Sequence, residues 1–161
     1  MDTNGSGFPV LRAATNDDGA RVAELVFAVL AEYGLAPDPD TTDADLRDIE
    51  QAYITNGGAF DVLADETGAI IGCVGLYRID HAVCELRKMY LDRAYRGRGL
   101  GKRLMEHAMD QARQLGFRRV ILESASVLHE AIAMYINYGF RRYECDHLSQ
   151  RCDQAYSLPV F

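Results

Sequence analysis

The chain has 161 residues, of which 48% are hydrophobic and 25% charged, with a formal net charge of -7 at pH 7. This composition, with 14 glycines and only 4 prolines, excludes disordered and collagen-like chains and is typical of a globular protein. The acidic balance argues against a general nucleic-acid binder, and the length fits one domain, which we place at residues 8–161 after a flexible segment, 1–7.

Hydrophobic spacing and turn residues predict alternating strands and helices. The expected elements are strand 10–14, helix 22–34, a more polar helix 42–54, strands 60–64 and 70–77 joined by a hairpin turn at 66–68, strand 83–91, helix 100–115, strand 118–123, helix 127–138, and a final strand pair, 140–145 and 155–161. The most regular is helix 100–115, whose apolar stripe ends at Gly116. We therefore expect a single α/β domain.

Neither a membrane anchor nor a metal centre is expected. The longest apolar runs, such as residues 26–31, fall far short of the roughly 20 residues that span a bilayer, and the polar N-terminus lacks the apolar core of a signal peptide. We therefore expect a cytoplasmic protein with no membrane partner. Cys145, His147 and Cys152 cluster near the C-terminus, but no C-x-x-C pair is present, which favours reduced thiols over zinc ligands or disulfides.

The charge is divided unevenly along the chain. Residues 1–60 hold three basic and eleven acidic side chains, a net charge of -8, whereas the remaining residues sum to +1. Five basic side chains fall within eleven positions of this second part: Arg93, Arg96, Arg98, Lys102 and Arg103. Such a basic cluster favours an anionic ligand even in an acidic protein.

A glycine-rich loop at the basic cluster links strand 83–91 to helix 100–115. Glycines let backbone N–H groups converge on phosphate oxygens, and the helix that follows directs its positive end at them. The dinucleotide spacing G-x-G-x-x-G fails at Lys102, and the P-loop pattern fails because Arg103 stands where Ser or Thr is required. The pattern that remains is R-x-x-G-x-G, from Arg96 to Gly101. The alternative is a glycine-rich turn with a solvated basic face.

Two motifs resemble those of a known family. The run Glu85–Leu91 followed by Arg96–Gly101 is similar to the acetyl-CoA signature of the GNAT superfamily of N-acetyltransferases. The segment Ala131–Phe140 resembles that superfamily's later tyrosine motif, Y-x-x-x-G-F. This resemblance implies a GNAT acyl-CoA N-acyltransferase fold, with a central mixed, mostly antiparallel sheet flanked by helices. It also implies an enzyme that uses acetyl-CoA as cosubstrate and no metal.

The resemblance assigns a set of residues to coenzyme A. The loop amides and the side chains of Arg96, Arg98 and Lys102 are expected to hold the pyrophosphate. The backbone of the preceding strand is expected to pair with the pantetheine arm, in a slot where two strands splay apart. The predicted cofactor-binding residues are Met89, Tyr90, Leu91, Arg96, Gly97, Arg98, Gly99, Leu100, Gly101 and Lys102.

Glu85 is the predicted general base. Acyl transfer needs a neutral amine, and a lysine-like amine with a pKa near 10.4 is about 4.6 kcal/mol from that state at pH 7, whereas an α-amine is only about 1 kcal/mol away. Glu85 matches the catalytic glutamate of some GNAT branches, acting directly or through a water. The alternative is an ion pair with Arg87 or Lys88 on the sheet. Cys84 is next to it, but neighbouring strand residues face opposite ways, so direct attack in a ternary complex is preferred to an acyl-cysteine.

Tyr135 is the predicted general acid, because it matches the family tyrosine that reaches the sulfur of coenzyme A. A phenol with pKa about 10 gives its proton to a thiolate near 8.5 only uphill, so a donated hydrogen bond is as consistent as full transfer. The alternative is an aromatic packed with Ile132 and Met134, a role that Tyr138 can also fill. Many members carry Asn seven positions before this tyrosine, where this chain has Leu128. The amide of Met89 is expected to polarise the thioester carbonyl.

The acceptor is expected to be a primary amine of a small molecule, peptide or protein. The family's acceptor site is bordered by the first two helices, where this chain carries Glu32, Asp38, Asp40 and Asp43. These carboxylates favour a cationic amine, although a solvated acidic face explains them equally well. The alternatives are a non-catalytic acyl-CoA-binding or sensing module, and a protein that uses the loop for a nucleotide. Edges left by the C-terminal strands would allow a homodimer.

Overall fold

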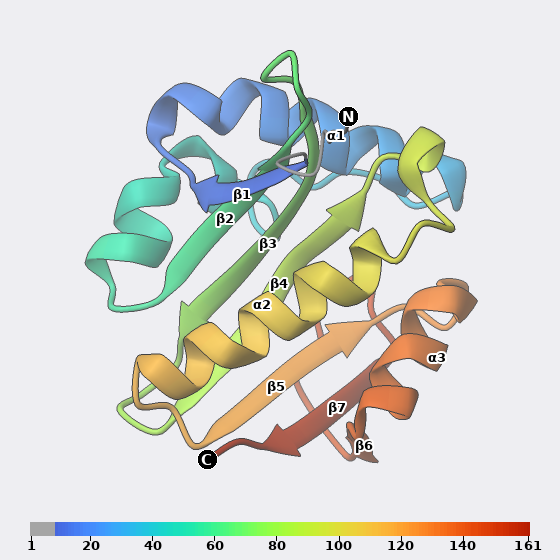
Figure 1. Ribbon diagram of the computed structural model, residues 1–161. Coiled ribbons are helices and arrows are strands. Elements are labelled where there is room, and N and C mark those ends of the chain that lie inside the picture. The colour runs from blue at the N-terminus through green and yellow to red at the C-terminus, as the bar shows by residue number, and fades with distance from the viewer. Residues whose placement is uncertain (1–8) are drawn as a thin grey trace.

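The computed structural model describes residues 9–161, so the predicted flexible segment 1–7 lies outside the described residues. Seven strands of this part form one sheet in the order β1-β2-β3-β4-β5-β7-β6 (Figure 1). Their bounds are β1 Val10–Ala13, β2 Ala59–Ala64, β3 Ile70–Arg78, β4 Val83–Leu91, β5 Arg119–Ser124, β6 Arg141–Tyr143 and β7 Gln154–Pro159. All neighbours are antiparallel except β4 and β5, which confirms the expected mixed, mostly antiparallel sheet.

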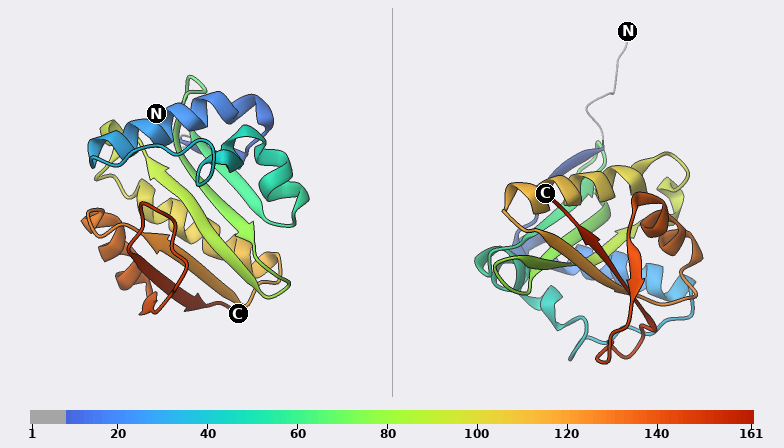
Figure 2. Two further views of the ribbon diagram at one scale, coloured as in Figure 1. Left: turned by 180° about the vertical axis from the view of Figure 1, so that it is seen from behind. Right: turned by 90° about the horizontal axis from the view of Figure 1, so that it is seen from below.

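Three helices cover the two faces of the sheet. Helices α2 (Leu100–Gln114) and α3 (His129–Tyr138) lie on one face, and α1 (Gly19–Glu32) lies on the other (Figures 1 and 2). The apolar stripe of α2 is buried from Leu100 to Ala112, and with Tyr135 of α3 it forms one core against the sheet, whereas Leu115 just after the helix is exposed. Helix α1 forms the second core on the opposite face. Across residues 9–161, no helix is long and apolar enough to cross a membrane.

The prediction of a single helix over 42–54 is wrong. The structure has a 3-10 turn, η2 (Ala44–Arg47), and a π-helical turn, η3 (Glu50–Thr55). Asp48 separates them, with the non-helical angles φ -148° and ψ 79°. Its carboxylate accepts hydrogen bonds from the amide of Gln51 and the side chain of Asn16, both at 3.0 Å. Aspartate commonly competes with helical hydrogen bonding in this way, so it ends one turn and begins the next.

Strands β4 and β5 diverge in the middle of the sheet. Their pairing ends at Glu85 and Ile121, although β4 continues to Leu91. A bulge in β4 follows, because Gly75 of β3 pairs with Arg87 whereas Cys73 pairs with Tyr90, which leaves one extra residue in β4. Lys88 in this bulge has φ +54°, in the left-handed region that side chains rarely adopt. The expected splay between two strands is therefore present at this divergence.

Candidate active site

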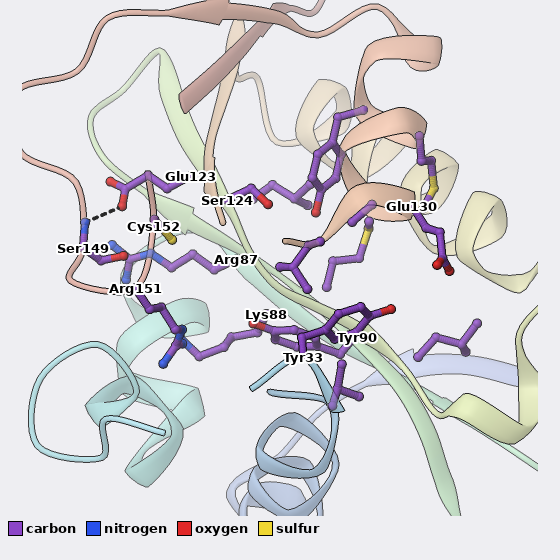
Figure 3. A pocket seen from close by; sticks show the side chains of 18 of the residues that line it. Tyr33, Arg87, Lys88, Tyr90, Glu123, Ser124, Glu130, Ser149, Arg151 and Cys152 are labelled. Atoms are coloured by element: carbon purple, nitrogen blue, oxygen red, sulfur yellow. Dashed lines mark hydrogen bonds between the residues drawn. The ribbon is translucent and has the colours of Figure 1, made fainter. Parts of the chain in front are cut away.

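A cavity of about 530 Å³ opens where β4 and β5 separate (Figure 3). Its lining comes from β4, the loop before α2, helix α3, the loop between β6 and β7, and the segment after α1. Among the predicted residues, the lining includes Glu85, Tyr135, Met89, Tyr90, Leu91, Arg96, Gly97 and Gly101. Arg98, Gly99, Leu100 and Lys102 belong to the same loop and helix start but do not line this cavity. The two predicted catalytic residues thus share one cavity with much of the predicted cofactor site.

The glycine loop has the backbone shape of an anion site. Gly97 has φ +80° and Gly99 has φ +79°, so both need the left-handed conformation that glycine adopts without strain. A Cβ built on either residue meets no atom within 4 Å, which leaves the backbone approachable. Gly99 is the N-cap of α2 and supplies no side-chain cap, so the first helical amides remain available to an anion. The loop therefore fits the pyrophosphate group that its sequence implies.

The side chain of Arg96 fastens this loop to two other elements. It donates hydrogen bonds of 3.1 and 2.9 Å to the carbonyl oxygen of Leu91 at the end of β4. Its guanidinium also pairs with both carboxylate oxygens of Glu32 at the end of α1, at 2.7 and 2.9 Å. Arg98 lies 5.4 Å from the ring centre of Tyr95. Arg96 therefore orients the loop, whereas Arg98 is an exposed cation beside it.

Glu85 lies on the face of the sheet opposite α2. Its strand neighbours Cys84 and Leu86 belong to the core beneath α2, and side chains alternate along a strand. Glu85 is only 9% exposed, and its Oε1 accepts bonds of 2.8 and 2.7 Å from Arg87. Burial raises the pKa of Glu85, while Arg87 acts in the opposite direction. The predicted ion pair with Arg87 is present, and Oε2 has no hydrogen-bond partner among residues 9–161.

Tyr135 reaches the cavity from the α2 side of the sheet. Its ring packs edge-on against Phe140, with centroids 5.9 Å apart, and lies 6.5 Å from the ring of Tyr156. The residue is 8% exposed, and burial raises its pKa. The hydroxyl therefore stays protonated through neutral pH, as a hydrogen-bond donor must. Tyr135 is thus packed among aromatic side chains, as the alternative to a general acid predicts, and it also lines the cavity, as a general acid must.

Cys84 and Cys152 carry little nucleophilic character. Burial raises the pKa of Cys84 to about 12, so this residue is a neutral thiol, and it faces away from Glu85. Burial also raises the pKa of Cys152, which does line the cavity. Among residues 9–161, no three His, Cys, Asp or Glu side chains come together in a way that could hold a metal ion.

The acidic residues expected to border the acceptor are already paired. Asp38 accepts hydrogen bonds from Thr41 and Thr42, Asp40 pairs with Arg47 at 2.7 Å, and Asp43 is buried. None of these three aspartates lines the cavity. The acidic segment therefore contributes structure rather than an open acidic surface toward the cavity.

Asp43 is the centre of a buried charge cluster that the sequence did not indicate. Its carboxylate lies 3.2 Å from Lys88 Nζ, and it accepts bonds of 2.6 and 2.9 Å from Arg151 in the loop between β6 and β7. Asp45 lies 3.3 Å from the same Lys88 Nζ. Burial opposes ionisation of Asp43, but its polar partners outweigh it, so the pKa of Asp43 is below its usual range. Three segments distant in sequence thus meet beside the cavity.

Glu123 of β5 is a second functional candidate that the motifs did not reveal. It lines the cavity, and its Oε1 accepts a 2.8 Å hydrogen bond from the amide of Ser149. It lies two positions beyond Ile121, the partner of Glu85, and therefore on the same face of the sheet. The only available sequence signal was a carboxylate within an otherwise apolar stretch of the predicted strand 118–123.

Comparisons with known proteins agree with this geometry. Residues 23–140 match the family model described as Acetyltransferase (GNAT) family. The chain is 42% identical over 137 residues to the uncharacterized N-acetyltransferase YjgM of Escherichia coli K12, covering 82% of this chain and 81% of that protein.

Solved structures share the fold. An acetyltransferase of the GNAT family from Staphylococcus aureus Mu50 superposes with a TM-score of 0.89 at 22% identity, covering 94% of this chain and 99% of the other. A GNAT superfamily phosphinothricin acetyltransferase from Sinorhizobium meliloti, solved in complex with acetyl-CoA, gives 0.73 at 23% identity, covering 94% and 88%. With the family model, the YjgM relationship and the shared fold together, the chain belongs to the GNAT family of N-acetyltransferases.

Proposed function

We propose that the protein transfers an acetyl group from acetyl-CoA to a primary amine by direct attack in a ternary complex. The observation that carries this proposal is the opening between β4 and β5. It joins Glu85 on one face of the sheet, Tyr135 on the other face, and the glycine loop between β4 and α2 within a single cavity. A thioester in that opening would meet an amine from the Glu85 side and a proton donor from the Tyr135 side.

The residues around the loop fit coenzyme A as a substrate. The left-handed glycines at 97 and 99 and the free first amides of α2 suit a pyrophosphate, which needs converging N–H donors. Arg98 and Lys102 are exposed cations at the same helix start. Met89, Tyr90 and Leu91 lie beyond the last β4–β5 pair, where strand pairing leaves room for an extended pantetheine arm. Arg96 orients the loop through Leu91 and Glu32.

The proposed reaction assigns one task to each catalytic group. Glu85 accepts a proton from the acceptor ammonium, directly or through a water, so that the neutral nitrogen can attack the acetyl carbonyl. The amide of Met89 stabilises the negative charge that develops on the carbonyl oxygen. A C–N bond forms and the C–S bond breaks. As the intermediate collapses, the nitrogen releases its second proton to solvent, and Tyr135 donates a hydrogen bond or its proton to the departing sulfur. Glu85 then releases its proton to solvent and Tyr135 recovers any proton it gave, so the products are the N-acetyl compound and coenzyme A.

One experiment tests this assignment against its alternatives. We expect acetyl-CoA and coenzyme A to raise the melting temperature, and a panel of primary amines to release free thiol from acetyl-CoA. Stabilisation by acetyl-CoA without thiol release from any amine would favour an acyl-CoA-sensing module. Stabilisation by ATP alone would show that the loop serves a nucleotide and would refute the proposal.

A further inference from the structure

The charged side chains beside the Glu85 end of the cavity form a network in which negative charges outnumber positive ones. Arg87 pairs with Glu85, at 2.7 Å between Nη2 and Oε1. Lys88 and Arg151 both pair with Asp43, and Lys88 also reaches Asp45. Each of the three cations is therefore already matched to a carboxylate inside the protein.

Glu123 is the carboxylate of this region that lacks a cation. Its one recorded hydrogen bond within residues 9–161 is the neutral amide of Ser149. Figure 3 shows Glu123, Ser149, Arg151 and Cys152 together at one end of the cavity and Glu130 at the other. With His147 of the same loop counted as neutral, three cations thus face four carboxylates, namely Glu85, Asp43, Asp45 and Glu123, and one negative charge remains uncompensated. Cys152 does not alter this balance, because burial raises the pKa of its thiol.

Glu123 is also placed correctly for an amine that reacts next to Glu85. The two strands pair Glu85 with Ile121, so Glu123 lies one pleat further along β5, on the same face and toward the divergence of the strands. The two carboxylates are close enough for the charge on Glu123 to raise the pKa of Glu85. An ammonium group held by Glu123 would therefore lie beside the proposed base.

We propose that Glu123 binds the ammonium group of the acceptor, and that the acceptor is an amine whose only charge is that ammonium. This inference rests on the proposed acetyl transfer and names its substrate class. One positive charge neutralises the excess carboxylate, and it forms a charge-assisted hydrogen bond in a partly buried site. A carboxylate on the acceptor would restore the excess negative charge, because Arg87, Lys88 and Arg151 already have partners. The site should therefore bind an amine that carries a carboxylate less tightly than one that does not.

Three four-carbon probes separate these charge patterns: n-butylamine, 4-aminobutanoate and 1,4-diaminobutane. Binding of each probe is measured by calorimetry on the protein saturated with coenzyme A, so the readout does not depend on turnover. We expect n-butylamine to bind more tightly than 4-aminobutanoate by about tenfold or more, and more tightly than the diamine. Tighter binding of either doubly charged probe would overturn the proposed substrate class.

The variant Glu123→Gln keeps the shape of the side chain and removes its charge. We expect it to weaken n-butylamine binding by about tenfold and to reduce the difference between n-butylamine and 4-aminobutanoate. We expect Glu123→Asp to retain part of the affinity, because its charge is kept on a shorter side chain. Glu66→Gln is the matched control, since Glu66 is an exposed residue of the turn between β2 and β3.

Kinetics with acetyl-CoA then separates this inference from the proposed function. Glu123→Gln should raise the KM for n-butylamine and leave the KM for acetyl-CoA within about twofold of the wild type. Unchanged n-butylamine binding in Glu123→Gln, or an equal loss in Glu66→Gln, would overturn the role of Glu123. Normal probe binding without thiol release from acetyl-CoA would instead refute acetyl transfer while supporting the ammonium site.

Discussion

Glu85 experiences two opposing influences at the residue scale. Burial favours its neutral form, whereas the adjacent Arg87 favours the carboxylate, and burial is the stronger influence, so the pKa is raised. The raised pKa of Glu85 lies closer to the pKa of an amine, so the Glu85 carboxylate is a stronger proton acceptor. The same shift has a cost, because Glu85 acts as a base only at pH values above its raised pKa. Activity should therefore fall as the pH drops through that value.

Replacing Glu85 by Gln tests this role. We expect kcat/KM near neutral pH to fall by about 100- to 10,000-fold for a lysine-like amine, the usual contribution of a positioned base. The loss should shrink as the pH approaches the pKa of the acceptor amine, which then loses its proton unaided, and the acidic limb due to Glu85 should disappear. The measurement is a pH profile of thiol release.

The control is Glu106→Gln, which removes a carboxylate from the exposed side of α2. We expect its profile to match the wild type. A Glu85→Gln enzyme with an unaltered profile would remove Glu85 from the mechanism and leave its ion pair with Arg87 as its only role.

At the scale of elements, local patterns predicted most of the fold. The apolar stripe of α2 and the β-rich runs of β2, β3 and β4 were readable because their periods follow from backbone geometry. The prediction of a helix at 42–54 was wrong for two reasons. Asp48 accepts a hydrogen bond from a nearby backbone amide, and Asp43 pairs with buried cations; the spacing of apolar residues reveals neither interaction.

The site divides in the same way. The glycine loop, Glu85 and Tyr135 belong to short motifs, so the sequence could reveal them. The ion pair between Arg96 and Glu32 spans 64 positions, and that between Arg151 and Asp43 spans 108. Such pairings are decided by tertiary packing, so no local spacing could predict them.

The turn into α2 is an element whose geometry admits a stability test. Gly99→Ala places a side chain at φ +79° without any steric contact, so the left-handed strain alone should destabilise the protein by about 1–2 kcal/mol. Gly101→Ala is the matched comparison. Gly101 is inside α2, and its added Cβ would meet only the flexible end of Met134 at 3.4 Å.

We expect Gly101→Ala to be neutral or to stabilise the protein by about 0.5–1 kcal/mol, because alanine is the better helix residue. Urea denaturation of both variants measures the difference. Equal effects of the two substitutions would contradict a backbone requirement at Gly99.

At the scale of the whole molecule, Asp43 connects parts of the chain that the sheet alone does not hold together. The carboxylate joins the segment after α1, the bulge of β4 and the loop between β6 and β7. Its side chain is 0% exposed, so removing its charge would leave Arg151 without its ion pair and the buried Lys88 with Asp45 alone. A buried pair that loses one member is strongly destabilised.

Asp43→Asn should accordingly lower the free energy of unfolding by about 3–5 kcal/mol. Asp40→Asn is the control, because Asp40 pairs with Arg47 at the surface with 85% of its side chain exposed, and its loss should cost less than about 1 kcal/mol. Urea denaturation measures both values. Similar losses in the two variants would contradict the special role of Asp43.

The same carboxylate predicts a pH dependence of stability. Because the folded pKa of Asp43 is lowered, its contribution is present above the unfolded pKa of about 3.9 and is lost as the pH falls through the folded pKa. The difference in stability between the wild type and Asp43→Asn should therefore shrink in acid.

The divergence of β4 and β5 also divides the sheet into two halves. Strands β1–β4 form one half of the sheet and β5–β7 the other. Within residues 9–161, three residue pairs join the halves, at Val83, Cys84 and Glu85 of β4. The Asp43 cluster ties the halves together again at the side of the cavity. The two halves of the sheet are therefore joined in two different ways: by backbone hydrogen bonds at the paired end of β4 and β5, and by side-chain ion pairs beside the cavity.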